Sequence, residues 1–337
     1  MALSLSTRKI GSVAVTAIGW GAMGLSAYYG KPKPDEERFA FLDALYASGC
    51  RNWDSADVYG DSEELLGQWF KKSGKRNEIF LATKFGIVRK ANRAVNGEPE
   101  YVKAAVERSL KRLGVDYVDL YYLHRPDPTV PIERTVSAMA ELVQAGKIKY
   151  LGLSEVSAND LRRAHAVHPI SAYQVEYSPF CLDIERDDVG LLKTCRELGI
   201  TVIAYSPLGR GLLTGRYKGP EDFEEGDFRL TIPKFSKGNF PKILTLAEKI
   251  KAIGAKYGAE ASTVCIAWVL AQGKDIIPIP GTTRIQNLKE NLAGMSLELS
   301  PQDLDEISTA VKAANLPEGT RYSQAGIQLC FADTPPL

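Results

Sequence analysis

The chain has 337 residues, of which 45% are hydrophobic and 25% are charged, so it is long enough to bury a sizeable core and has the composition of a globular protein. Its formal net charge of +1 lacks the basic excess of nucleic-acid-binding proteins, and no apolar run reaches the length of a membrane span. We therefore expect neither a nucleic-acid partner nor a membrane partner.

The N-terminal residues predict a small hairpin and then a strand. Residues 9–15 have a Gly-Ser pair at their centre, which is typical of a turn between two short strands. Residues 15–20 form a short apolar run, which we predict as the first strand of the main sheet.

Residues 19–24 carry the glycine spacing of the dinucleotide-binding fingerprint, G-x-G-x-x-G. In a true fingerprint the glycines open a helix directly, so that a pyrophosphate meets the helix N-terminus. Here a Lys-Pro-Lys-Pro segment follows, and the next helix is predicted only from about residue 35. We therefore predict no Rossmann fold, although glycines at this place would still let a cofactor approach Gly21 and Met23 closely.

Residues 53–60 follow the helical pattern of residues 38–48 and a short strand at residues 50–53. They place Asp54 at the end of that strand and Tyr59 in the loop beyond it. A tyrosine ionises near pH ~10 and is a poor acid at neutral pH. It becomes a useful proton donor if a cation lowers its pKa and a carboxylate holds that cation in place. The stretch therefore predicts a cation nearby.

Two further strand ends supply candidates for that cation and for a polar neighbour. Lys84 directly follows the apolar run of residues 79–83, and His124 directly follows that of residues 117–123. In a parallel barrel all strand ends of one sense meet at one face, where active sites are built. Alone, such a lysine is most simply a solvated charge and such a histidine a structural side chain. The order of all four polar residues at matching strand ends instead predicts a catalytic site.

The rest of the chain alternates strands with helices. Helices are predicted at residues 62–72 (with Ser62 as N-cap), 99–113, 131–144, 158–167, 187–198, 242–257, 261–272, 284–293 and 301–311. Further strands are predicted at residues 147–153, 171–175, 200–204 and 275–279, and loops at residues 85–98 and 216–241. The second loop is long enough to serve as a lid or binding loop. Eight alternating β/α units predict a single (β/α)8 TIM-barrel domain over residues 1–337, rather than an open sheet.

The five cysteines and three histidines are scattered and show none of the spacings of a zinc site. Unpaired cysteines are typical of reduced thiols in the cytosol, and residues 1–6 lack the features of a signal peptide. We therefore expect a cytoplasmic protein without a bound metal.

Seven short motifs follow one another along the chain. They are WDSADVYG (53–60), ATKFG (82–86), LHRPD (123–127), GLSE (152–155), QVEYS (174–178), YSPLGRG (205–211) and IPGTTR (279–284). In this order they resemble the aldo-keto reductase superfamily over essentially the whole chain. Residues 151–169 and the C-terminal TPPL resemble the perakine reductase branch of plant, fungal and bacterial reductases. The resemblance implies an oxidoreductase that reduces a small-molecule aldehyde or ketone with hydride from NADPH.

The resemblance implies a role for each of the four polar residues. Tyr59 matches the general acid that protonates the carbonyl oxygen as hydride arrives. Lys84 would lower the pKa of Tyr59, and Asp54 would hold Lys84. His124 would orient the carbonyl by a hydrogen bond. General acid catalysis and stabilisation of the developing alkoxide are the two largest effects that such a site offers.

The resemblance also implies which residues hold the cofactor. Ser154 and Gln174 match contacts to the nicotinamide carboxamide, and Tyr205 matches the aromatic ring that stacks on the nicotinamide. The remaining cofactor candidates are Gly21, Met23, Asp54, Ser206, Leu208, Gly211, Gly281, Thr283, Arg284, Asn287, Glu290 and Asn291. Arg284 at a helix start suits the 2′-phosphate of NADPH, although alone it reads as a solvated surface residue. Glu155 stands where many relatives have Asn, and Arg125 or a substrate amine are open alternatives for its partner.

The predicted substrate pocket is mainly aromatic. Its candidate residues are Trp20, Tyr28, Tyr29, Phe85, Arg125 and Tyr177. Aromatic walls suit a fairly apolar carbonyl compound, and the patterns single out no one substrate. Both a monomer and a homo-oligomer are compatible with the sequence.

Two other functions share the barrel. One is a nucleotide-binding regulatory subunit that acts through a protein partner. The other is an aldolase that uses Lys84 as a Schiff base. The complete set of four polar residues and the nucleotide-like segment at residues 281–291 favour the reductase over both.

Overall fold

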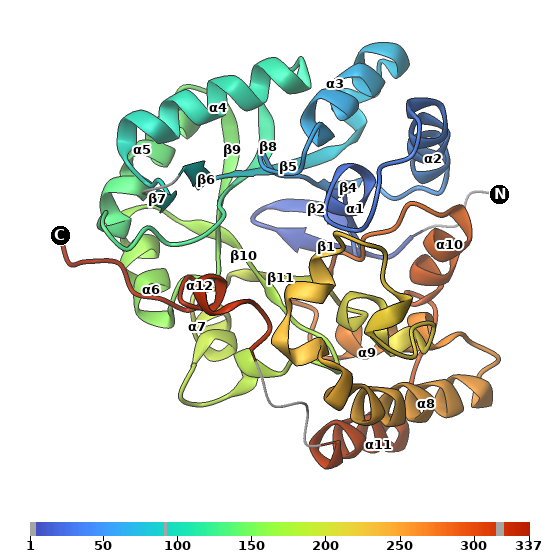
Figure 1. The fold of residues 1–337 in the computed structure, drawn as a ribbon. Helices are drawn as coiled ribbons and strands as arrows, with labels where there is room; N and C mark the ends of the chain where they lie inside the picture. The colour runs from blue at the N-terminus through green and yellow to red at the C-terminus, as the bar shows by residue number, and fades with distance from the viewer. Residues whose placement is uncertain (1–4, 91–92, 315–319) are drawn as a thin grey trace.

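The computed structural model describes residues 5–90, 93–314 and 320–337, and its centre is an eight-stranded parallel sheet (Figure 1). Neighbouring strands are, in order, β3 (Trp20–Gly21), β4 (Asn52–Asp54), β5 (Phe80–Phe85), β8 (Val118–Leu123), β9 (Ile148–Ser154), β10 (Ile170–Glu176), β11 (Thr201–Tyr205) and β12 (Ile276–Pro278). Apart from Trp20–Gly21, these strands lie close to the predicted apolar runs.

Strands β3 and β12, at the two ends of this order, meet each other. The N–H of Gly19 donates to the carbonyl oxygen of Pro278 at 2.9 Å, and Gly21 forms a parallel bridge with Gly281. A Cβ added to Gly21 would lie only 3.1 Å from the carbonyl oxygen of Ile279. The glycines of the fingerprint-like segment therefore let the sheet close, and the predicted (β/α)8 barrel is confirmed.

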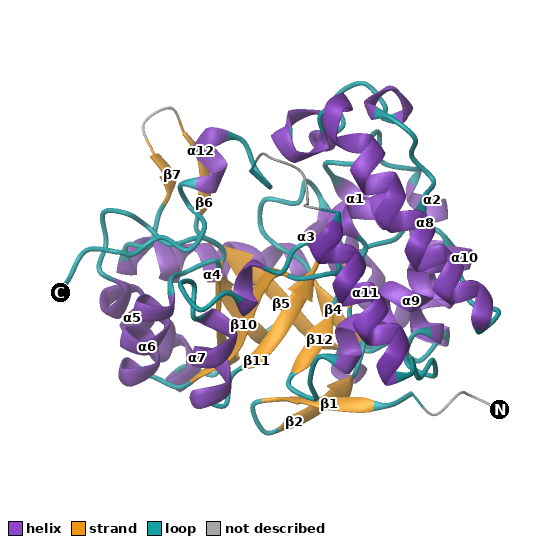
Figure 2. Ribbon diagram, turned by 90° about the horizontal axis from the view of Figure 1, so that it is seen from below, coloured by secondary structure: helices purple, strands orange, loops and turns teal. Residues whose placement is uncertain are grey.

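The larger helices surround this sheet (Figures 1 and 2). They are α2 (Asp35–Ala47), α3 (Ser62–Ser73), α4 (Pro99–Leu113), α5 (Ile132–Gln144), α6 (Ala158–Val167), α7 (Leu191–Glu197), α8 (Phe240–Lys256), α9 (Ala261–Ala271), α10 (Ile285–Ala293) and α11 (Pro301–Ala313). Helix α4 illustrates the local signals, because Pro99 opens it and Gly114 ends it in a left-handed conformation at φ 62°. None of the described helices is long and apolar enough to cross a membrane.

An N-terminal hairpin covers the end of the barrel opposite to the carboxyl ends of the strands (Figure 2). Its strands are β1 (Thr7–Ile10) and β2 (Val13–Thr16), as the turn signal predicted. Ile10 and Val15 pack with side chains of the barrel interior, and Arg8 donates to the carbonyl oxygen of Leu270 at 2.7 Å. The prediction of residues 15–20 as the first barrel strand was wrong, because the apolar end of β2 serves the hairpin.

Several loops contain structure that composition did not indicate. Residues 85–98, predicted as a loop, include the antiparallel hairpin of β6 (Ile87–Lys90) and β7 (Arg93–Val95). Two four-residue helices, α1 (Met23–Ser26) and α12 (Gln324–Ile327), were also missed. Ser62 is the first residue of α3, and Asp61 takes the N-cap position. In Figure 2, β6, β7 and α12 lie at the same end of the barrel, opposite β1 and β2.

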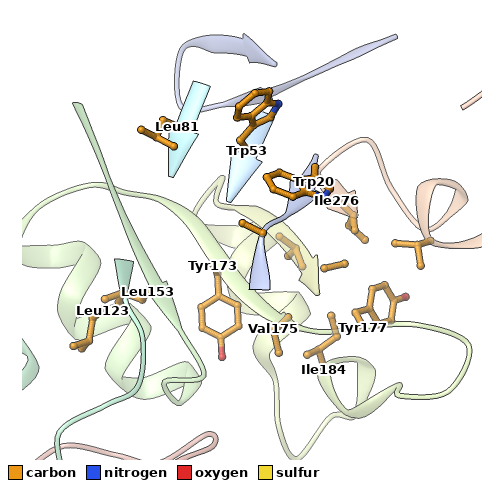
Figure 3. Close-up of a cluster of buried hydrophobic side chains, with 14 of the residues drawn as sticks. Trp20, Trp53, Leu81, Leu123, Leu153, Tyr173, Val175, Tyr177, Ile184 and Ile276 are labelled. Atoms are coloured by element: carbon orange, nitrogen blue, oxygen red, sulfur yellow. The ribbon is translucent and has the colours of Figure 1, made fainter. Parts of the chain in front are cut away.

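Side chains of the barrel strands alternate between the interior and the outer layer. The interior cluster contains Phe80, Ala82, Leu120 and Tyr122, each two residues from the next on its strand. The outer cluster, drawn in part in Figure 3, holds their neighbours, such as Leu81 and Leu123. This period of two decides which residues at the strand ends can face a ligand.

Candidate active site

A cavity of about 790 Å³ opens at the carboxyl ends of the barrel strands. Its wall includes the strand-end residues Asp54, His124, Ser154, Gln174 and Tyr205. Such a volume lies within the range of about 300–1,000 Å³ that is typical of small-molecule sites. Among the described residues, no group of three or more His, Cys, Asp or Glu side chains is arranged to hold a metal ion.

The structure brings the four predicted catalytic residues together at this cavity. Lys84 is 0% exposed, and its Nζ donates to a carboxylate oxygen of Asp54 and, at 3.4 Å, to the hydroxyl of Tyr59. Gln174 Nε2 donates to the other oxygen of Asp54 at 2.8 Å. The His124 ring lies edge-on to the Tyr59 ring, with 5.8 Å between centroids. A phenol, an ammonium and an imidazole thus converge on one place.

Burial dominates the electrostatics of these groups. It raises the pKa of Tyr59 well above its usual value, and the neighbouring Asp54 carboxylate adds to that rise. Tyr59 therefore lacks the lowered pKa that the sequence predicted, because burial outweighs the effect of the nearby cations. Burial also lowers the pKa of Lys84 and raises that of Asp54, while the charge of each opposes the shift of the other. Such a phenol holds its proton until a stronger base, such as an alkoxide, forms beside it.

His124 is a neutral side chain in this site. Burial, followed by the charges of Arg125 and Lys84, lowers the pKa of His124 well below its usual value. Its Nδ1 is buried without a hydrogen-bond partner in the part of the chain that the structure describes. A neutral imidazole donates one N–H and carries no extra proton.

The partner of Glu155 is Arg321, which the sequence did not indicate. Arg321 donates to both carboxylate oxygens of Glu155, at 2.9 and 2.5 Å. Arg321 is the main reason why the pKa of Glu155 falls to about 2 despite burial, which alone would raise it. The hydroxyl of Tyr205 also donates to Glu155, at 2.7 Å. The main partner of Glu155 is thus a residue 166 positions away, while the charge of Arg125, one of the predicted alternatives, lowers the pKa of Glu155 to a smaller extent.

The C-terminal segment forms part of the cavity wall. Tyr322, Ser323, Gly326 and Leu329 line the cavity. The Tyr322 hydroxyl lies 2.8 Å from that of Tyr205 and accepts a hydrogen bond from Arg125 at 3.1 Å. No local signal in residues 320–330 marked these side chains, because their contacts are with distant strand ends.

Most of the predicted cofactor residues line the cavity. These are Gly21, Met23, Asp54, Ser154, Gln174, Tyr205, Ser206, Leu208, Gly211, Gly281, Thr283, Arg284 and Asn287. The nine-residue helix α10 begins next to Arg284, so a cation and free backbone N–H groups lie at this end of the cavity. Glu290 and Asn291, which were also predicted, do not line the cavity. The Glu290 carboxylate accepts a hydrogen bond from Ser262 Oγ at 3.1 Å, and Asn291 Oδ1 is buried without a partner among the described residues. An anionic nucleotide fits this set of donors.

Three predicted pocket residues lie in the outer hydrophobic layer instead. Trp20 packs on Phe41, Phe85 stacks on Tyr121 with centroids 4.9 Å apart, and Tyr177 packs on Trp268. Phe85 and Tyr177 follow Lys84 and Glu176, respectively, by one position, so the alternation along the strand turns the two rings outward. Figure 3 shows Trp20 and Tyr177 in this outer cluster. Tyr28, Tyr29 and Arg125 line the cavity as predicted.

The long connection before α8 covers one side of the cavity. Residues 216–239 form short 3-10 turns rather than a featureless loop. The N–H of Phe228 donates to the carbonyl oxygen of Tyr28 at 3.1 Å, and the two rings pack edge-on at 5.7 Å. This contact joins the connection to the segment after α1 and narrows the space between them.

The burial of Asp57 leads us to predict that the thermal stability of the protein depends on pH. Burial, reinforced by Glu63, raises the pKa of Asp57 to about 7, and its Oδ1 is buried without a described partner. An unfolded aspartate has a pKa near ~3.9, so the folded chain binds the proton more tightly. The Asp57 proton therefore contributes its full stabilisation of the fold below the pKa of the unfolded aspartate. This contribution is lost as the pH rises through the folded pKa of about 7. We expect Asp57→Asn to melt a few degrees above the wild type at pH 8 and no higher at pH 4.

Thermal melting at both pH values tests this prediction. A variant that melts above the wild type by the same margin at pH 4 and pH 8 would show that packing, and not ionisation, explains the difference. The exposed pair of Arg186 and Asp188 offers the control, because Asp188→Asn removes a carboxylate that is already in water.

The sequence and the fold were compared with known proteins. Residues 17–312 match the model of the Aldo/keto reductase family. The chain is 55% identical over 340 residues to the aldo-keto reductase str7 of Strobilurus tenacellus, covering 99% of each chain. It is 49% identical, again over 99% of each, to the aldo-keto reductase yakc of Schizosaccharomyces pombe, whose name carries the label NADP(+). The glycerol dehydrogenase AKR11B4 of Gluconobacter oxydans has a similar structure, with a TM-score of 0.82, 26% identity and coverage of 93% of this chain and 97% of that one.

Proposed function

Because the chain belongs to the aldo/keto reductase family, we propose that it uses NADPH to reduce an aldehyde or ketone, with Tyr59 as the proton donor. The observation that carries the proposal is the hydrogen-bonded group of Asp54, Lys84 and Tyr59, in which Asp54 and Tyr59 line the cavity and Lys84 lies buried behind them. The coarser conclusion, that the chain is an oxidoreductase of this family, follows from the similarity itself. Membership of the perakine reductase branch stays a prediction.

Each polar residue has a separate task in the proposed reaction. When bound, NADPH supplies the hydride that reaches the carbonyl carbon. Tyr59 gives its hydroxyl proton to the carbonyl oxygen, so the product leaves as an alcohol. Lys84, held by Asp54, stabilises the phenolate that remains, and His124 donates an N–H to the same oxygen. The four side chains thereby place positive charge and donors where negative charge develops.

The cavity supports NADPH at its other end. The backbone N–H groups at the start of α10 and the guanidinium of Arg284 suit a phosphate. The NADP(+) label of the relative from Schizosaccharomyces pombe points to the same cofactor. Arg284 is exposed and has no described ion-pair partner, so it is available to a 2′-phosphate.

Replacing Arg284 by Ala should change cofactor preference. We expect the Kd of NADPH to rise about tenfold and the Kd of NADH to change less than threefold, because only NADPH carries the 2′-phosphate. Cofactor fluorescence titrations measure both constants. Lys289→Ala, which removes an exposed cation from the same helix, is the control. Equal increases for both cofactors would remove Arg284 from the 2′-phosphate site.

Turnover of a generic aldehyde tests the proposed function. Purified protein is mixed with NADPH and 4-nitrobenzaldehyde, and the loss of NADPH absorbance is followed, with NADH in parallel. We expect steady turnover with NADPH preferred. Tight binding of NADPH without turnover of any aldehyde would instead favour a regulatory subunit that acts through a protein partner.

A further inference from the structure

Arg125 is a buried cation that forms no ion pair with the carboxylates that the structure describes. Its side chain lines the cavity and the residue is 8% exposed. Its guanidinium donates to the carbonyl oxygen of His124 at 2.7 Å, to Ser154 Oγ at 3.4 Å and to the Tyr322 hydroxyl at 3.1 Å. No described carboxylate lies within ion-pair distance of it. A charge taken out of water in this way is costly unless an opposite charge joins it.

The other buried cations described around the cavity each pair with a carboxylate, as Arg229 does with Asp227 at 2.6 Å. Lys84 binds Asp54, Arg321 binds Glu155, and Arg210 binds Glu176 at 3.1 Å. One more carboxylate, that of Asp183, lies 3.5 Å from Arg321, but it is 39% exposed and is not part of the cavity wall. The carboxylates of Glu155 and Glu176 thus pair with Arg321 and Arg210, and Arg125 feels Glu155 only through its longer-range charge, so its guanidinium can bind a ligand carboxylate directly.

Arg125 is also close to the reacting groups. It directly follows His124, and its positive charge acts on Tyr59, whose pKa it lowers against the larger effect of burial. Tyr322 holds the guanidinium from one side, with 5.4 Å between its ring centroid and the Arg125 Cζ. The guanidinium is therefore preorganised beside the place where the carbonyl is expected.

We propose that Arg125 determines substrate specificity by binding a carboxylate on the substrate, so that the preferred carbonyl compounds are aldehyde acids or keto acids. The proposal rests on the proposed carbonyl reduction and narrows its substrate class. A guanidinium forms short, charge-assisted hydrogen bonds with a carboxylate, and the low local dielectric around a buried guanidinium strengthens them. The Tyr28 and Tyr29 rings in the same cavity accommodate the apolar part of such a compound.

The opposing interpretation is that Arg125 serves the cofactor. Its neighbour Ser154 is expected to hold the nicotinamide carboxamide, and an arginine 3.4 Å from that hydroxyl would strengthen the same contact. The two interpretations differ in what a substitution changes. A substrate-binding arginine controls the ratio of kcat/KM values for charged and neutral aldehydes, whereas a cofactor-binding arginine controls the Kd of NADPH and lowers both kcat/KM values alike.

The experiment compares 3- and 4-formylbenzoate with their methyl esters, which keep the aldehyde and the ring but replace the negative charge by a neutral methyl ester. We expect wild-type kcat/KM to be about tenfold or more higher for at least one acid than for its ester, as for a charge-assisted hydrogen bond. Arg125→Gln should abolish that preference while changing the ester reaction and the Kd of NADPH much less. Arg125→Lys, which keeps the charge, should retain part of the preference. That result would show that the loss in Arg125→Gln is not caused by a folding defect.

Controls separate the possible outcomes. Arg186→Gln removes one positive charge from an exposed side chain that is not part of the cavity wall, so it should leave the acid-to-ester ratio unchanged. A wild-type protein that reduces the esters but prefers neither acid overturns the inference and leaves the proposed function intact. Equal losses for acid and ester in Arg125→Gln, together with weaker NADPH binding, overturn it in favour of the cofactor. No turnover of any of the four aldehydes contradicts the proposed function itself.

Discussion

Tyr59→Phe is expected to lower kcat for 4-nitrobenzaldehyde by about 10³-fold, within the range that loss of a general acid produces. The substitution removes only the hydroxyl that Lys84 Nζ reaches at 3.4 Å and keeps the ring that packs edge-on against His124. The cavity shape and the Kd of NADPH should therefore change little. Steady-state kinetics and a fluorescence titration with NADPH measure the two quantities.

Tyr28→Phe is the matched control for that experiment. Tyr28 lines the same cavity and its ring packs edge-on to Tyr59 with 6.2 Å between centroids, but Lys84 makes no described hydrogen bond to it. We expect its loss of kcat to stay below about tenfold, because no proton transfer depends on it. If Tyr59→Phe keeps near-normal kcat, or if both variants lose activity equally, Tyr59 is not the acid.

Arg321→Met is expected to destabilise the folded protein by about 3–5 kcal/mol, which is typical of breaking a buried ion pair from one side. Glu155 is fully buried, and without Arg321 its charge would lose its one described ion pair and keep the hydroxyl of Tyr205, a weak contact from the N–H of Glu176 at 3.4 Å and the more distant charge of Arg125. Its pKa, now about 2, should rise as the carboxylate loses its main counter-charge. Urea unfolding at neutral pH measures the change in the free energy of unfolding.

The double variant Glu155→Met with Arg321→Met tests whether the stability lost in Arg321→Met comes from the unpaired charge of Glu155. Removing both charges leaves no uncompensated ion, so the double variant should be more stable than Arg321→Met alone. Arg186→Met, which breaks a pair whose side chains are 61% and 65% exposed, should change stability by less than about 0.5 kcal/mol. A double variant that is less stable than the single one would show that Glu155 and Arg321 contribute mainly through separate contacts.

Local sequence patterns were sufficient to predict most strands and helices of the barrel. Apolar runs bounded by turn residues marked the central strands, and Pro99 and Gly114 marked the ends of α4. The predicted ends of an element were wrong where that element depends on contacts with residues far away in the sequence. The strand Trp20–Gly21 has only two residues and owes its place to pairing with β4 and to closure against Gly281, so no periodic pattern could mark it.

The alternation of side chains along each strand also predicts which residues face away from the site. Asp54, Lys84 and His124 could be assigned to one face because parallel strands end together. The same alternation of side chains already turned Phe85 and Tyr177 away from that face, since each follows an inward residue by one position. Their placement in the outer layer was thus determined by the sequence, and aromatic character alone was a poor guide to the pocket.

The tertiary structure alone decided the charge state and the far wall of the site. Arg321 and Tyr322 reach Glu155 and Tyr205 across more than a hundred residues, and only the path of the C-terminal segment brings them there. The raised pKa of Tyr59 likewise depends on how completely the surrounding side chains exclude water. A sequence encodes the periodicity of each strand and helix directly, because those contacts join near neighbours. Burial and long-range ion pairs exist only after the strands have closed into a barrel, so they are properties of the whole fold.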